Sequence, residues 1–374
     1  MQKNEQNLFI GNLLQNINSK YILKLMFSFP NVFMSLKIIK YNKNIQKKFD
    51  ININAYIKAY KEINQVEIKI IPKERFRFNK SKTFINIQNP KDEKYCHIYF
   101  NNNNAEIKRH YYTEEDNISS IKIILDYNFS SFHKLFERCI CIEKIYFKKF
   151  GNITHITDMS YMFFDCSSLK EIYFTNFNTD NINDMSFMFH GCQSLKELDL
   201  SCFNTENVTN MRNMFNNCKI LEEINLSSFD TRNVTDMRNM FNNCKRLKVL
   251  NISNFNTKNV YDMKGMFSFC ESLEKLDLSC FNTGNVINIS NMLSHCYNLS
   301  YLDISNFSTY NVTNMNNMFS YCQSLEEIKD FYFNTKNVIY MEDILYRCSD
   351  KIKTKIIKNL SHLKSKKIYK KFDY

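Results

Sequence analysis

Tryptophan is absent from this 374-residue chain, and only 5 glycines and 3 prolines are present. A loop-rich β-sandwich needs many glycines and prolines in its turns, so their scarcity argues against that class. No stretch approaches the roughly 18 uncharged apolar residues of a membrane-spanning helix, and we expect none. The first 20 residues carry Glu5 and many asparagines and do not form a convincing secretory signal. We therefore expect a cytoplasmic protein, with the cell surface as the alternative.

Motifs for metal binding and catalysis are also missing. The 13 cysteines form no Cys-x-x-Cys pair, and the closest two, Cys139 and Cys141, are too near in sequence for a zinc knuckle. No phosphate-binding loop or recognisable pair of catalytic carboxylates is present. His190 and His295 each lie close to a repeated cysteine, but equivalent positions elsewhere vary, so we interpret them as surface residues. We expect a protein that is not an enzyme and holds no cofactor or metal.

The net charge of +12 is concentrated at the ends of the chain. Residues 1–100 contain 18 Lys/Arg and 7 Asp/Glu, and residues 351–374 contain 9 Lys and 1 Asp, which leaves −7 between them. Basic ends could contact an anionic partner, or they could be a solvated lysine surface. The segment Arg75-Phe76-Arg77-Phe78 mixes basic and aromatic residues, but we do not expect the protein to bind nucleic acid.

A strict 26-residue repeat dominates the remainder of the chain. Phenylalanine, leucine and methionine columns keep the same step as a cysteine column. The cysteines of that column are Cys166, Cys192, Cys218, Cys244, Cys270, Cys296, Cys322 and Cys348. Because cysteine behaves as a small buried hydrophobe, we expect these thiols to form a free structural ladder rather than disulfides.

Each repeat contains two apolar patterns. Met185, Met188, Phe189 and Cys192 follow the i, i+3, i+4, i+7 spacing of a short helix. The alternation from Leu195 to Leu200 then predicts a half-buried strand. One unit cannot bury its own apolar side, so neighbouring units must stack. The predicted fold class is therefore an α/β repeat solenoid, leucine-rich-repeat-like, with a short strand and a short helix per 26-residue rung.

The repeat closely resembles the BspA-like leucine-rich repeat, also known from mycoplasma-type lipoproteins. The motifs that carry the resemblance are Phe229-Asp230-Thr231, Asn233-Val234-Thr235-Asp236-Met237, Met240-Phe241 and Cys244-Lys245-Arg246-Leu247. They recur over about residues 132–348. The resemblance implies a leucine-rich-repeat-like solenoid without catalytic residues, and bacterial members are often surface proteins that bind other proteins. The repeats also contain glycosylation triplets at Asn207, Asn233 and Asn311, which we interpret as part of the repeat.

We expect three regions: an α+β region at 1–130, the solenoid of about nine rungs at 131–350, and a lysine-rich capping helix at 351–374. Residues 19–49 predict two helices broken at Pro30, a pattern that weakly resembles an F-box-like adaptor module. A small, mostly antiparallel sheet should follow. Its alternations are Val66/Ile68/Ile70, Ile85/Ile87, Ile98/Phe100 and Ile121/Ile123, with a hairpin turn at Asn101 to Asn104.

The outward residues of the predicted strands differ from rung to rung, whereas the core columns do not. Solenoids bind partners on such extended faces, so we expect a monomeric protein–protein interaction scaffold whose strand face holds a protein partner. An F-box-like substrate adaptor of a ubiquitin ligase and a cell-surface adhesin are the alternatives. The expected partner-binding residues are Glu171, Tyr173, Glu197, Asp199, Glu223, Asn225, Asn251, Lys275, Asp277, Tyr301, Asp303 and Glu327.

Overall fold

A computed structural model describes residues 64–74, 82–151, 153, 155–329 and 332–360. The chain divides into two compact units, Met1–Ile63 and Asn64–Tyr374. The helix pair expected at residues 19–49 belongs to the first unit and lies outside the described residues. The strands, turns and helices with known placement all belong to the second unit.

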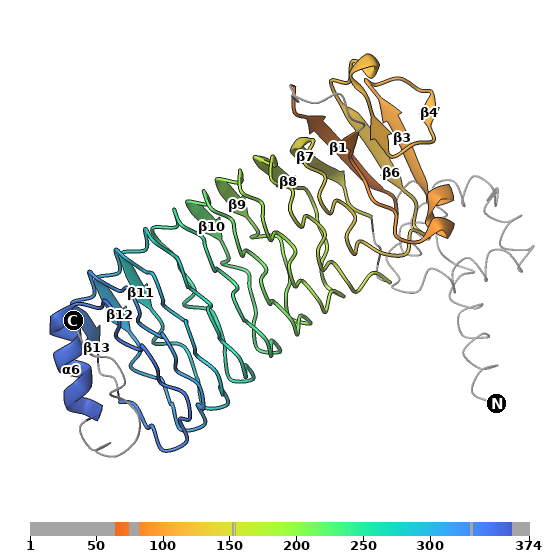
Figure 1. The fold of residues 1–374 in the computed structure, drawn as a ribbon. Coiled ribbons are helices and arrows are strands. Elements are labelled where there is room, and N and C mark those ends of the chain that lie inside the picture. The colour runs from red at the N-terminus through yellow and green to blue at the C-terminus, as the bar shows by residue number, and fades with distance from the viewer. Residues whose placement is uncertain (1–63, 75–81, 152, 154, 330–331, 361–374) are drawn as a thin grey trace, which may run out of the picture. The chain divides into compact units, whose positions relative to one another are not determined.

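The second unit begins with a six-stranded sheet in the order β4-β3-β6-β1-β7-β8 (Figure 1). All neighbours are antiparallel except β7 and β8, which are parallel. The strands are β1 Val66–Pro72, β3 Cys96–Phe100, β4 Glu106–Ile107, β6 Ile121–Leu125, β7 Ile142–Lys149 and β8 Glu171–Phe174. Residues at every second position are buried in β1, β3 and β6, as expected for strands with one face on a core.

The expected small antiparallel strands are present with one exception. Ile85 and Ile87 lie outside any strand; the nearest is β2 Lys82–Thr83, which pairs with β5 Tyr111–Tyr112. The turn at Asn101 joins β3 to the short strand β4, and Asn101 and Asn102 both adopt positive φ. Two 3-10 helices, η2 Pro90–Tyr95 and η3 Glu114–Asp116, connect the remaining segments.

The predicted repeat solenoid is confirmed, because successive units stack in register 26 residues apart. The rung strands are β9 Glu197–Asp199, β10 Glu223–Asn225, β11 Lys275–Asp277, β12 Tyr301–Asp303 and β13 Glu327–Lys329. Parallel pairing places Leu198 opposite Ile224, and Leu302 opposite Ile328. A second ladder of seven parallel bridges runs from Asp158 to Tyr340.

The prediction of a short helix in each rung is wrong. The segment that contains the methionines and the cysteine of the rung forms two consecutive turns. The N–H of Phe187 donates to the Arg212 carbonyl in the next rung at 2.9 Å, whereas the N–H of Met188 bonds within the rung to Met185 at 3.3 Å. Phe187 and Gly191 have φ of 58° and 74°, and every rung repeats these two left-handed residues. A left-handed residue interrupts an α-helix. The fold is thus a β-solenoid of stacked turns and short strands.

The turns bury the same stripe that a helix would have buried. Met185, Met188, Phe189 and Cys192 are all inaccessible to solvent. Rings of the phenylalanine column stack between rungs, with centroids 5.4 Å apart for Phe163–Phe189. Together with the N-terminal sheet, these residues form one continuous hydrophobic core.

The cysteine column is a ladder of free thiols, as expected. The Sγ–H of Cys192 donates to the Phe163 carbonyl at 3.3 Å, and Cys218 repeats this contact with Phe189 at 3.2 Å. Burial raises the pKa of the Cys218 thiol to about 12, so the thiol stays protonated and unreactive at neutral pH.

Helix α6, Asp350–Leu360, follows the last rung. It buries Ile352 and Ile356, and Lys355 Nζ donates to the Ile328 carbonyl on β13 at 2.6 Å. The rest of the expected capping segment, residues 361–374, lies outside the described residues. The helix therefore packs on the apolar end of the stack that the final rung would otherwise expose.

Candidate functional site

The strand face carries two outward columns that contain all the residues expected to bind a partner. The first, which we name the recognition column, consists of Glu171, Glu197, Glu223, Val249, Lys275, Tyr301 and Glu327. The second contains Tyr173 followed by an Asx column, namely Asp199, Asn225, Asn251, Asp277 and Asp303. Most of these side chains are exposed, Glu171 and Tyr301 are half-buried, and Asp303 is buried.

The Asx column has a structural task that the sequence interpretation missed. The Oδ1 atom of Asp199 accepts the N–H of Ser201 at 3.0 Å, and Asp277 accepts that of Ser279 at 2.9 Å. Asn225, Asn251 and Asp303 make the same contact. Such bonds close a turn two residues ahead. The signal was available, since every member of the column is Asp or Asn with serine two positions later.

Asp303 is the member that departs furthest from the expected exposed site. Only 3% of it is exposed, and Lys329 from the next rung donates to its carboxylate at 2.9 Å. Burial by itself would raise the pKa of Asp303, but hydrogen bonds from Ser305 and Lys329 outweigh it and leave that pKa below its ordinary value. Asp303 is therefore an anchored core anion and does not offer a free carboxylate.

The recognition column varies in chemistry from rung to rung. Its strand pairing is interrupted at Val249, which lies outside any strand, between the sheet of β9 and β10 and the sheet of β11, β12 and β13. Among the described residues, the side chains of Glu197, Glu223 and Lys275 make no hydrogen bond or ion pair. Val249 is 77% exposed at the middle of the column. The N-terminal end differs, because Glu171 pairs there with Lys144 at 2.7 Å.

The glycosylation triplets are part of another ladder. The side-chain amide of Asn207 donates to the Asp180 carbonyl of the preceding rung at 2.7 Å. Asn233 and Asn311 repeat this contact at 2.7 and 2.6 Å. A glycan on these amides would replace a hydrogen that the ladder uses or crowd the neighbouring rung. The triplets therefore follow from stacking, as the repeat pattern predicted.

A threonine ladder lies beside it. Thr231 Oγ1 donates to the Asn256 carbonyl at 3.0 Å and accepts the Asn256 N–H at 2.7 Å.

A family model described as "Mycoplasma protein of unknown function, DUF285" matches residues 130–249 and 236–360, and so covers these ladders and well over half of the chain. The chain belongs to this family. No curated protein and no solved structure matches it.

Potential metal ligands are scattered over the DUF285 rungs in the part of the chain that the structure describes. Within that part, no three His, Cys, Asp or Glu side chains gather as metal ligands would. The helices described there are all too short or too polar to cross a bilayer.

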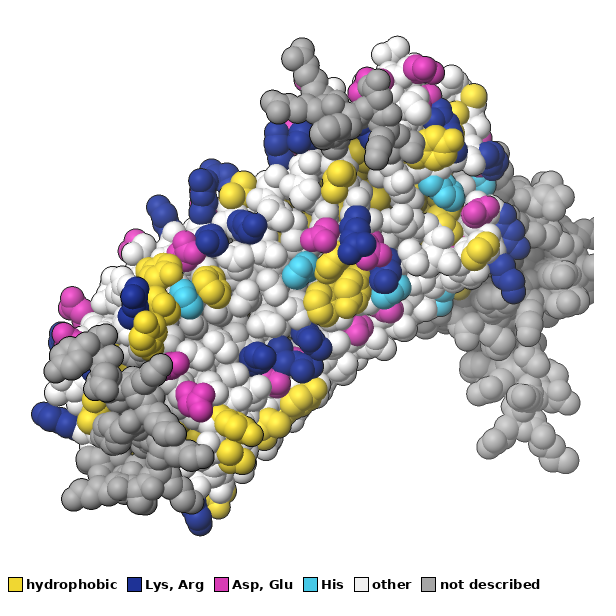
Figure 2. All heavy atoms as spheres, viewed as in Figure 1, with side chains coloured by type: hydrophobic (Ala, Val, Ile, Leu, Met, Phe, Trp, Pro, Cys, Tyr) yellow, Lys and Arg dark blue, Asp and Glu magenta, His cyan; other side chains and the backbone are white. Residues whose placement is uncertain are grey.

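The turns of the DUF285 rungs carry two groups of stacked aromatic side chains. Figure 2 shows hydrophobic side chains gathered beside histidines on this face of the rungs. In the first, Tyr161 stacks on Phe187 with ring centroids 4.5 Å apart, and Phe164 stacks on His190 at 4.7 Å. In the second, His295 lies between Phe269 and Tyr321 at 4.1 and 4.2 Å. Burial lowers the pKa of both histidines, which favours the neutral ring. The sequence signal was the 26-residue spacing of aromatic residues at positions that hold asparagine elsewhere.

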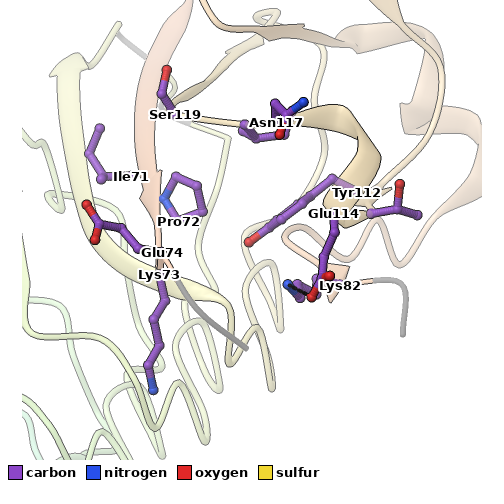
Figure 3. A pocket seen from close by; sticks show the side chains of 11 residues that line it. Ile71, Pro72, Lys73, Glu74, Lys82, Tyr112, Glu114, Asn117 and Ser119 are labelled. Atoms are coloured by element: carbon purple, nitrogen blue, oxygen red, sulfur yellow. Dashed lines mark ion pairs between the residues drawn. The ribbon is translucent and has the colours of Figure 1, made fainter. Parts of the chain in front are cut away.

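A pocket lies in the N-terminal sheet, between the end of β1, β2, β5 and η3 (Figure 3). Its rim includes Lys82 Nζ and Glu114 Oε1, 3.8 Å apart, and the hydroxyl of Tyr112 points between them and Lys73. Burial raises the pKa of Tyr112, so its hydroxyl stays protonated at neutral pH. Residues 75–81, between Glu74 and Lys82, lie outside the described residues, and we assign this pocket no ligand.

Proposed function

We propose that the protein is a non-enzymatic scaffold that binds a protein partner through the recognition column of the strand face. The observation that carries this proposal is that the columns of the repeat use their polar side-chain atoms differently. The Asx column uses its polar atoms to close turns, and the threonine and asparagine columns use theirs to join neighbouring rungs. The recognition column uses almost none in this way, and its residues range from acidic to basic, aromatic and aliphatic.

The dimensions of the column suit a protein interface. Seven rungs at the roughly 4.8 Å spacing of paired strands extend over about 29 Å. A stable interface needs roughly 800 Å² on each partner, which a strip of that length supplies if the partner also contacts the flanking side chains. Exposed Val249 and half-buried Tyr301 would provide apolar contacts, and the charged members would provide orientation.

The motifs shared with the BspA-like leucine-rich repeat support the same proposal, because members of that family often bind other proteins. We also propose that the repeats are related to the BspA-like leucine-rich repeat and that the protein is cytoplasmic. The adaptor alternative depends on residues 19–49, which lie outside the described residues, and no described contact favours it.

The experiment is affinity purification of the tagged full-length protein from its native cell, with mass spectrometry, beside two variants of equal charge change. One reverses Glu197 and Glu223 to lysine on the recognition column. The control reverses Glu206 and Asp180 to lysine at the corner of the rungs, where the side chains are exposed. We expect the first variant alone to lose the partner. Equal recovery by both variants would reject the recognition column as the binding surface.

A further inference from the structure

The first aromatic group lies on a different side of the rungs from the recognition column. We name it the turn-face cluster and define it as Tyr161, Phe164, Phe187, His190 and Arg212. Its rings are nearly parallel, inclined by 9° for Tyr161–Phe187 and by 7° for Phe164–His190. In rings stacked face to face along the solenoid, each face is covered by the neighbouring ring, and the positively polarised edges are not. All five residues are half-buried, so these edges reach the surface.

Cations surround the stacked rings. The Arg212 guanidinium lies 5.7 Å from the Phe187 ring centroid, and Arg138 lies 5.9 Å from that of Phe164. Lys134 lies 5.5 Å from that of Tyr161. Two of these cations form ion pairs: Lys134 Nζ is 3.8 Å from Glu137, and Arg138 Nε is 3.9 Å from Asp165. Arg212 has no ion pair with any described residue.

A comparison with the next rung shows what Arg212 lacks. Arg238 occupies the equivalent position, and its Nε donates to Asp236 at 2.9 Å and lies 3.7 Å from Asp262. Where Arg238 has Asp236 two residues earlier, Arg212 has Asn210. The Asn210 Oδ1 atom already accepts the backbone N–H of Arg212 at 3.1 Å, and an amide carries no charge to neutralise the guanidinium.

Two polar atoms of the cluster are buried without a partner. Among the described residues, four buried side-chain nitrogen or oxygen atoms make no hydrogen bond, and Arg212 Nε and His190 Nδ1 are two of them. Both residues contact the same ring, since His190 lies 5.7 Å from Phe187. Buried polar atoms are nearly always satisfied in folded proteins, so an unsatisfied pair in one half-exposed cluster indicates a missing acceptor.

We propose that the turn-face cluster binds an acidic segment of a partner protein. On binding, the Arg212 and His190 side chains turn outward, so that one carboxylate of the segment accepts hydrogen bonds from Arg212 Nε and from the N–H tautomer of His190 Nδ1, both of which are buried in the free protein. The apolar part of the segment packs against the ring edges. The surroundings favour a peptide over a nucleic acid, because Glu137, Asp165 and Asp184 lie beside the cluster and would repel a continuous row of phosphates. A peptide can present a single carboxylate between neutral residues.

This inference does not depend on the proposed function of the recognition column. The two surfaces use different columns of the repeat. The variants that test the recognition column leave the residues of the turn-face cluster unchanged, and the variants of the cluster leave the recognition column unchanged. Loss of binding at the turn-face cluster would leave the strand-face proposal intact, and the reverse also holds.

The test is fluorescence anisotropy of the full-length protein with a fluorescein-labelled peptide that carries one glutamate between leucines in an otherwise neutral sequence. The same peptide with glutamine in place of that glutamate and a labelled single-stranded oligothymidylate are the comparison probes. The variant is Arg212→Gln. Its matched control, Arg232→Gln, removes the same charge from an exposed arginine that is paired with Asp230 at 2.6 Å. Arg212→Lys keeps the charge but removes Nε and the planar fork.

We expect the acidic peptide to bind, the glutamine peptide to bind at least tenfold more weakly, and Arg212→Gln to weaken binding by about tenfold. Arg212→Lys should fall between, and Arg232→Gln should change the affinity less than twofold. Thermal melting of the variants checks that the fold survives. No binding of the acidic peptide, or equal losses in Arg212→Gln and Arg232→Gln, would overturn the proposal. So would Arg212-dependent binding of the oligothymidylate alone.

Discussion

Lys329 reaches back one rung to Asp303, and its Nζ lies 2.9 Å from the Asp303 carboxylate. The same carboxylate accepts the N–H of Ser305 at 3.0 Å and is almost completely buried. We predict that Asp303→Ala lowers the free energy of unfolding by about 2 kcal/mol, because it removes a charge-assisted hydrogen bond and a turn closure together. Urea unfolding measures this, and a loss below about 0.5 kcal/mol would contradict the anchored role.

The same contact predicts a pH dependence. The pKa of Asp303 is lower in the folded protein than in the unfolded chain, so the unfolded chain binds the extra proton as acid is added. The stabilisation is complete above the unfolded pKa of about 3.9 and is lost as pH falls through the lower folded value. Asp303→Asn should therefore unfold with a shallower pH dependence below about pH 4 than the parent protein. Parallel acid-unfolding curves would contradict this.

Neighbouring positions on one strand should respond differently to mutation. Asp277 accepts the Ser279 N–H, whereas the Lys275 side chain has no hydrogen-bond partner among the described residues. We predict that Asp277→Ala costs about 1 kcal/mol of stability and that Lys275→Ala changes it by less than about 0.5 kcal/mol. Differential scanning calorimetry of the two variants measures the contrast. Equal melting temperatures would show that the Asx column is not structural.

The threonine ladder contains its own control. Thr231 exchanges two hydrogen bonds with Asn256 in the next rung, whereas Thr335 Oγ1 is buried without a partner among the described residues. Valine has nearly the same shape as threonine. We predict that Thr231→Val destabilises the protein by about 1–2 kcal/mol, and that Thr335→Val is neutral or stabilising. Chemical denaturation of both variants decides this, and the opposite order would refute the ladder.

The left-handed turn residues should tolerate only certain side chains. Asn291 has φ of 56°, and asparagine is one of the few residues that adopt this conformation readily. We predict that Asn291→Gly is close to neutral and that Asn291→Ile costs about 1–2 kcal/mol or more. A helical segment would give the reverse order, because glycine destabilises a helix more than isoleucine does. Thermal melting therefore separates the stacked turns from a helix.

The period, the stacking and the buried columns could be predicted from the sequence, because hydrophobic residues at fixed 26-residue intervals can be buried together only when the units stack in register. The turn segment could not, because Met185, Met188, Phe189 and Cys192 have a spacing that both a helix and two consecutive turns can bury. The decisive clue was local: asparagine recurs at the positions of Asn213 and Asn217, where φ is positive.

The candidate site was predictable to a smaller extent. Outward alternation identified the strand face, but it could not separate Glu197, which has no described partner, from Asp199, which closes a turn. The turn-face cluster depends on contacts between rungs, such as Arg212 over Phe187. These two residues are 25 positions apart and come together only when the rungs stack. The ion pair that Arg212 lacks is recognised by comparison with Arg238, which pairs with Asp236 in the next rung.

The most direct test of the recognition column is site-specific photo-crosslinking in the native cell. A photoreactive phenylalanine analogue would replace Val249, which is 77% exposed at the middle of the column, and in a second strain Tyr310, which is 52% exposed elsewhere on the rungs. We predict a discrete protein adduct from position 249, which Glu197→Lys with Glu223→Lys abolishes, and no such adduct from position 310. An absence of adduct at 249, or the same adduct at both positions, would contradict the proposed binding surface.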